Sequence, residues 1–191
     1  MAGFESTLSA IWASVGIGIV NVVFTVISLY LVDRIGRRKL YFIGLSGIAF
    51  SVLCLSACFI YANQLGEIGR WLMVIFMFGY VAFFAISIGP LGWLVISEIF
   101  PQKVRGLGTS IGSLAVWIFN CIVSFTFFKI IDFFSIPGTE IVVGQTTSEN
   151  PAGAFFLYGF IAVLGLVWRY LFLPETKGLS LEEIEQKWRK N

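Results

Sequence analysis

Five long apolar runs separated by short polar stretches constrain this 191-residue chain more than any other feature of its sequence. An α-helix rises 1.5 Å per residue, so it needs about 20 apolar residues to cross a hydrocarbon core of about 30 Å. Lipid offers no partners to backbone N–H and C=O groups, and the runs lack the short alternating pattern of barrel strands. We therefore expect an all-α fold, a multi-pass membrane bundle of about five transmembrane helices. The expected helices cover residues 8–32, 40–62, 71–96, 107–131 and 152–173.

The composition supports a membrane protein and excludes several other classes. The chain is 58% hydrophobic and 13% charged, whereas soluble domains carry roughly 25% charged residues. The basic residues are spread over short loops, so we expect no nucleic acid partner. There is no histidine, and the three cysteines show no CxxC spacing, so we expect no metal and no cofactor. Because no nucleophilic side chain can be paired with a histidine as general base, the chain is also not expected to be an enzyme.

The distribution of lysine and arginine predicts the orientation. The loops after the first and third runs together hold Arg34, Arg37, Arg38, Lys39, Lys103 and Arg105. The opposite loops hold only Arg70 and Lys129. Because basic residues mark the cytoplasmic side, we expect a cell-membrane protein with its N-terminus outside and its C-terminus in the cytoplasm.

The two longest polar stretches are expected to play minor structural roles. The stretch 132–151 is rich in proline and glycine and is typical of turns rather than of a domain. After the bundle, residues 1–175, comes a short tail, 176–191, in which Ser180 and Glu183 have the spacing of a capping box. We expect this tail to form an amphipathic helix on the cytoplasmic face of the membrane.

Two of the runs carry a polar stripe at helical spacing. The stripe in the first run consists of Ser14, Gly18, Asn21, Thr25 and Ser28, and the one in the fourth run consists of Ser113, Trp117, Asn120 and Ser124. Each set lies on one face of a helix. Such faces either let transmembrane helices approach and hydrogen-bond, or line a cavity for a polar solute. The residue types leave both interpretations open.

The third run contains a segment that is expected to break the helix, Gly89-Pro90-Leu91-Gly92-Trp93. Proline removes a backbone donor and clashes with the preceding turn, so a kink is expected around Gly89, Pro90 and Gly92. The kink is either purely structural or, as in many transporters, a movable joint beside the solute path.

Charged residues of both signs gather at the predicted cytoplasmic ends of three runs. They are Asp33, Arg34, Arg37, Arg38, Glu98, Arg105 and Glu175. Topology signalling needs bases alone, so the acids predict ion pairs that join helix ends. Exposed pairs contribute only about 0–1 kcal/mol each, which suits a gate that opens and closes.

Four motifs in this order, DRIGRR, GPLGW, SEIFPQKVRG and PETKG, resemble the sugar porter branch of the major facilitator superfamily, and the resemblance covers nearly the whole chain. Its members have twelve helices in two halves, with the sugar site between the halves. The five runs resemble helices eight to twelve, so a partial major facilitator fold is expected. The resemblance thus implies a truncated half that does not transport alone, with the missing N-terminal half as its partner.

The resemblance also implies the function and the site. It implies transport of a monosaccharide by alternating access, as sugar uniport or sugar/proton symport. The residues that match the family's sugar contacts are Asn21, Trp93, Trp117 and Asn120, whereas Val116 stands where many relatives carry asparagine or glutamine. The charged cluster above would form the cytoplasmic gate.

Two other functions stay open at this point. The same framework could carry a polyol or another small solute, although a carboxylate solute would favour an added cation and the membrane segments offer only Arg169. Alternatively, the chain is a non-transporting membrane subunit that pairs with a complete porter.

Overall fold

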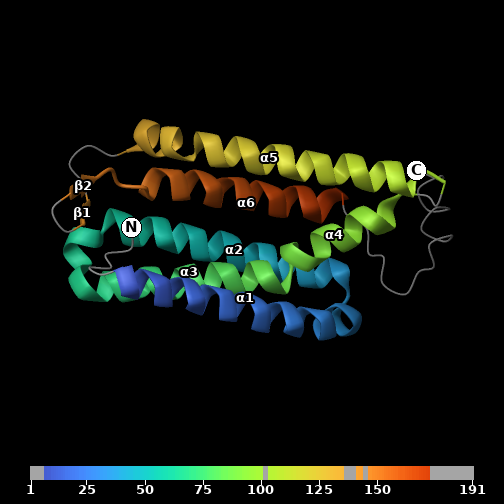
Figure 1. Cartoon of the computed structure of the whole chain (residues 1–191), viewed down its shortest axis with the longest axis horizontal. Coiled ribbons are helices and arrows are strands. Elements are labelled where there is room, and N and C mark those ends of the chain that lie inside the picture. The colour runs from blue at the N-terminus through green and yellow to red at the C-terminus, as the bar shows by residue number, and fades with distance from the viewer. Residues whose placement is uncertain (1–6, 101–102, 136–140, 144–145, 173–191) are drawn as a thin grey trace.

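The computed structural model describes residues 7–100, 103–135, 141–143 and 146–172, and this part of the chain is a bundle of lengthwise helices (Figure 1). Five of its segments are long and apolar enough to cross a membrane, as expected. α4 runs obliquely and joins α3 to α5 (Figure 1). The helices are α1 (Thr7–Ile35), α2 (Arg37–Ile60), α3 (Ala62–Ile86), α4 (Ile88–Ile99), α5 (Arg105–Phe134) and α6 (Ala152–Phe172).

α2 is the central helix of the bundle. Half of the residues in its apolar 18-residue stretch are buried, compared with 6% in the corresponding stretch of α1 and none in that of α5. Its closest approaches use small residues: Gly44 and Gly47 lie against Ser87 and Phe83, at the end of α3. Such small residues let transmembrane backbones come close enough for van der Waals packing to hold them together. On its other side α2 packs along α6.

α1 and α2 are joined by a single residue, Gly36. Its backbone has φ 93°, a value that favours glycine because it has no Cβ. The carbonyl of Gly36 accepts the Leu40 N–H at 3.2 Å and so begins α2. This tight turn puts α1 beside α2 and sets the basic residues around it at one end of the bundle.

The helix that contains the third apolar run begins earlier than predicted. The prediction placed its start at residue 71, whereas α3 starts at Ala62. The stretch between is polar, which predicts a loop, but a helix can extend beyond the hydrocarbon core, where water satisfies the backbone groups that its own bonds leave free. The extension contains one non-helical residue, Gly66, with φ 52°, which separates the first turn from the rest of α3.

The chain changes direction at Ser87, between α3 and α4. Ser87 has φ −129° and ψ −83°, outside the helical region. The predicted break residues Gly89, Pro90 and Gly92 themselves lie inside α4, in its first turns. Proline is tolerated in the first turn of a helix, where its missing N–H is not needed, so the break falls before Pro90 rather than at it.

The stretch 132–151 is not made of turns alone, and this corrects the prediction. β1 (Ile141–Val143) and β2 (Thr146–Ser148) form a small antiparallel hairpin in which Val142 pairs with Thr147. β-branched residues on both sides of a two-residue connection favour such a hairpin. The predicted tail helix, residues 176–191, lies outside the described residues.

Candidate functional site

The polar stripe of α1 lies beside the seam that this helix buries. Half-buried residues recur at Ile17, Val20, Phe24, Ile27 and Leu31, and α1 packs mainly on α3. Each residue of the stripe from Gly18 to Ser28 follows one of these half-buried residues in the sequence, so the stripe lies about 100° further around the helix. The Asn21 side chain is accordingly exposed, whereas Ser28 is 1% exposed.

Of the two interpretations of the stripe, Ser28 supports contact between helices rather than a solute cavity, because its side chain joins two helices. Its hydroxyl donates to the Ile86 carbonyl at 2.6 Å, across from α1 to the last residue of α3. The Thr25 hydroxyl donates instead to the Asn21 carbonyl of its own helix. One stripe thus contains an interhelical contact at one end and an exposed amide in the middle.

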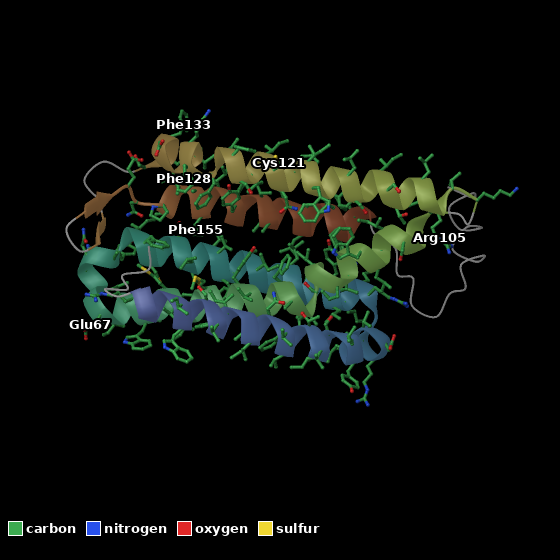
Figure 2. All side chains as sticks on the ribbon, viewed as in Figure 1. Glu67, Arg105, Cys121, Phe128, Phe133 and Phe155 are labelled. Carbon is green, nitrogen blue, oxygen red and sulfur yellow. The ribbon has the colours of Figure 1, made fainter. Side chains whose placement is uncertain are left out.

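The middle of α5 is uncovered in the described part of the chain. α5 contacts α4 near its start and α6 near its end, but residues 117–125 are all exposed. This segment holds Trp117, which is 67% exposed, and Asn120, whose amide donates to the Val116 carbonyl at 2.9 Å. Cys121 marks the segment in Figure 2. Both predicted site residues of α5 therefore lie on an open surface.

Trp93 lies on α4, which contacts both of the helices that carry the other predicted site residues. α4 contacts both α1 and α5, and the Trp93 side chain is 50% exposed. The predicted sugar-contacting residues thus come from three helices in the series α1, α4, α5, and all four are exposed. Their convergence on one solute stays a prediction.

The predicted gate residues that are described lie at one end of the bundle, the end that Arg105 marks in Figure 2, opposite Glu67. The Arg38 guanidinium donates to the Tyr170 carbonyl at 3.3 Å, and Arg105 Nε donates to the Phe100 carbonyl at 3.4 Å. These two bonds tie α2 to the last turn of α6, and α5 to the end of α4. Asp33 and Arg34 are exposed and Arg37 is half-buried. The side chain of Glu98 and all of Glu175 lie outside the described residues.

Sequence reasoning missed the environment of Arg169, which is buried although it lies in a membrane segment. It is 4% exposed, and its guanidinium carbon lies 4.1 Å from the centre of the Tyr41 ring. A guanidinium over an aromatic face is attracted by the ring quadrupole, more strongly when water is excluded. Arg169 therefore packs α6 onto α2 and is not exposed beside the polar stripes.

We expect Arg169 and Tyr41 to be energetically coupled by about 1–2 kcal/mol. The measurement is a double-mutant cycle of unfolding in mixed micelles with Arg169→Met and Tyr41→Leu. Tyr41→Phe keeps the ring face and is the matched control, so it should retain most of the coupling. A coupling within experimental error of zero would contradict the assignment.

Comparison with known proteins gives a consistent result over nearly the whole chain. A family model described as "Sugar (and other) transporter" matches residues 1–188. A D-xylose-proton symporter-like protein of Arabidopsis thaliana, described as chloroplastic, is 39% identical over 97% of this chain and 30% of its own length. The D-xylose-proton symporter of Escherichia coli K12 is 34% identical over 96% of this chain and 34% of its own length. A probable polyol transporter of Arabidopsis thaliana is 30% identical over 96% and 32%.

Solved structures of the Escherichia coli xylose transporter XylE share the fold. The structure of this proton:xylose symporter bound to 6-bromo-6-deoxy-D-glucose gives a TM-score of 0.79 at 33% identity, covering 96% of this chain and 36% of that one. Its inward open conformation gives 0.73 at 32% identity, covering 95% and 36%. The chain thus spans about a third of the length of the relatives it matches.

Proposed function

Because the chain belongs to the sugar (and other) transporter family, the sugar porter branch of the major facilitator superfamily, we propose that it forms one side of a monosaccharide site in an alternating-access transporter. The observation that carries the proposal is that the family match runs through residues 1–188 and includes α1, α4 and α5, on which the side chains of Asn21, Trp93, Trp117 and Asn120 are exposed. The chain is a membrane protein. Asn21 and Asn120 would hydrogen-bond sugar hydroxyls, and Trp93 and Trp117 would stack on the ring.

The exposure of these residues supports a site that further helices complete. A sugar that bound to an open face would remain hydrated, and its hydrogen bonds would contribute little over those to water. Helices that cover α1, α4 and the middle of α5 would exclude that water. We propose that the sugar lies between this bundle and such a second set of helices, and that the chain does not transport without them.

The basic end of the bundle supports a cytoplasmic orientation for that end. The turn between α1 and α2 and the connection between α4 and α5 lie at the same end (Figure 1), and six basic residues lie in or next to them: Arg34, Arg37, Arg38, Lys39, Lys103 and Arg105. The positive-inside rule places this end in the cytoplasm. Here Arg34, Arg37, Arg38 and Arg105, with Asp33, Glu98 and Glu175, would form the gate that closes when the site faces outward.

Polyol transport is the second candidate, because two relatives are described as probable polyol transporters. Polyols and sugars present the same hydroxyl groups to asparagine and tryptophan. A carboxylate solute is less well supported, since Arg169 is buried on Tyr41.

A chimera tests the proposal directly. Residues 1–188 replace the matching third of the Escherichia coli D-xylose-proton symporter, and uptake of labelled xylose, glucose and a polyol is measured in proteoliposomes. We expect saturable sugar uptake by the chimera and none by the isolated chain. Saturable uptake by the isolated chain would refute the need for further helices, and a folded chimera that carries only the polyol would favour the second candidate.

Within the chimera, Trp93→Ala and Asn120→Ala should each weaken sugar binding about ten-fold. A lost ring stack or hydrogen bond costs about 1.4 kcal/mol, and this free energy corresponds to a ten-fold change in the dissociation constant. Binding is measured by scintillation proximity with labelled sugar. The matched controls are Trp71→Ala, which removes a tryptophan that is 70% exposed on α3, and Asn63→Ala, which removes an exposed asparagine. Equal losses in the controls would remove the support for these contacts.

A further inference from the structure

The joint between α3 and α4 contains a backbone acceptor that proline leaves without its usual donor. In a continuous helix the N–H of residue 90 would bond to the carbonyl of residue 86. Residue 90 is proline, which has no N–H and whose ring clashes with that carbonyl. The Ile86 carbonyl therefore needs a donor from elsewhere, because a backbone acceptor without a partner is costly in a membrane.

The Ser28 hydroxyl supplies this donor from a different helix. Ser28 Oγ lies 2.6 Å from the Ile86 carbonyl oxygen, and Ser28 is 1% exposed. The two residues are 58 positions apart in the chain, so the bond fixes the end of α3 against α1. It is made at the residue immediately before the break.

α2 also packs against the joint. Ser87 is completely buried, and its hydroxyl donates to the Phe83 carbonyl at 3.1 Å. Gly44 of α2 lies against it so closely that a Cβ at this position would overlap the Ser87 hydroxyl. The joint is therefore contacted by a hydrogen bond from α1 and by the backbone surface of α2.

We propose that Ser28 is a positioning residue: by donating to the Ile86 carbonyl it sets the angle at which α4 leaves the joint, and thereby the position of Trp93. Trp93 lies on α4, six residues beyond Ser87, so a change in the angle moves its ring. Without the donor, the Ile86 carbonyl must turn toward water or another group, and α4 samples more than one direction. The role of the Trp93 position in sugar binding rests on the proposed function, whereas the effect of Ser28 on the angle of α4 does not depend on it.

Fluorine NMR of the whole chain tests the proposal in lipid nanodiscs without any sugar, so that its outcome is independent of transport. The chain has six tryptophans; they are labelled with fluorotryptophan, and the Trp93 resonance is assigned with Trp93→Phe. In Ser28→Ala we expect the Trp93 resonance to split or to move by more than its linewidth. In Ser28→Thr, which keeps a hydroxyl, we expect the original resonance.

The matched control is Ser56→Ala, which removes another buried serine hydroxyl that donates to a carbonyl of a different helix, that of Ala152 at 2.7 Å. It should leave the Trp93 resonance unchanged. An unchanged Trp93 resonance in Ser28→Ala overturns the proposal. Equal movement of all the tryptophan resonances also overturns it, because it shows a general structural role. Should Ser28→Ala fail to fold, Ser28→Cys, which has a weaker donor, replaces it under the same criteria.

Discussion

Gly44→Val is expected to separate α2 from the α3–α4 joint and to destabilise the bundle by about 3 kcal/mol or more. A Cβ at Gly44 would overlap the Ser87 hydroxyl and lie 3.0 Å from the Phe83 carbonyl oxygen. Neither neighbour can move freely, because one belongs to the buried joint and the other to the helix backbone. Overpacking of a close interface costs about 1–3 kcal/mol and more when the backbone must shift. The measurement is unfolding in mixed micelles followed by tryptophan fluorescence.

The control for this prediction is Gly18→Val. Gly18 also lies inside a membrane helix, but no atom lies within 4 Å of a Cβ at this position. Valine has a higher helix propensity than glycine by a few tenths of a kcal/mol, so this variant should be as stable as the original chain or slightly more so. Equal unfolding curves for the two variants would show that the approach at Gly44 does not hold α2 in place.

The long apolar runs made the helical fold predictable, because their lengths follow directly from the thickness of the bilayer. The ends of the helices were less predictable. Hydropathy marks where the apolar run begins, at Trp71, but α3 begins at Ala62, with the non-helical Gly66 between its first turn and the rest. The hairpin around Val142 was also not predicted, because the proline and glycine residues of this stretch indicate turns as strongly as its β-branched residues indicate strands.

The position of the break shows which part of the joint could be predicted from local sequence. Pro90 predicts a kink and also identifies Ile86 as the carbonyl that loses its donor. That the donor is Ser28 depends on how α1 packs on α3, which one sequence does not reveal. The spacing of the stripe placed Ser28 and Asn21 on the same face, yet one is buried and the other exposed. Spacing defines a face, but the neighbouring helices decide which part of it is covered.

Asn150 was missed although the sequence contained a signal for it. Asparagine followed by proline before an apolar run is typical of a helix start, with asparagine as the cap and proline in the first turn. In the structure Asn150 Oδ1 accepts the Ala152 N–H at 3.0 Å, and its Nδ2 donates to the Phe59 carbonyl at 3.0 Å. The Phe59 and Phe155 rings stack beside this point, 5.4 Å apart, where α6 begins (Figure 2). Asn150 therefore caps α6 and fastens its start to the end of α2.

Asn150→Leu should destabilise the chain by about 2–4 kcal/mol, because leucine has a similar volume but leaves the buried Ala152 N–H and the half-buried Phe59 carbonyl without these partners, at about 1–3 kcal/mol each. Asn150→Ser should cost less: its shorter hydroxyl can still accept the Ala152 N–H but does not reach the Phe59 carbonyl. Unfolding of both variants in mixed micelles is compared with that of Asn63→Leu, which replaces an exposed asparagine at the start of α3. If leucine and serine had equal effects, the bond to α2 would contribute nothing beyond the cap. If neither differed from the control, α6 would be held to α2 by apolar packing alone.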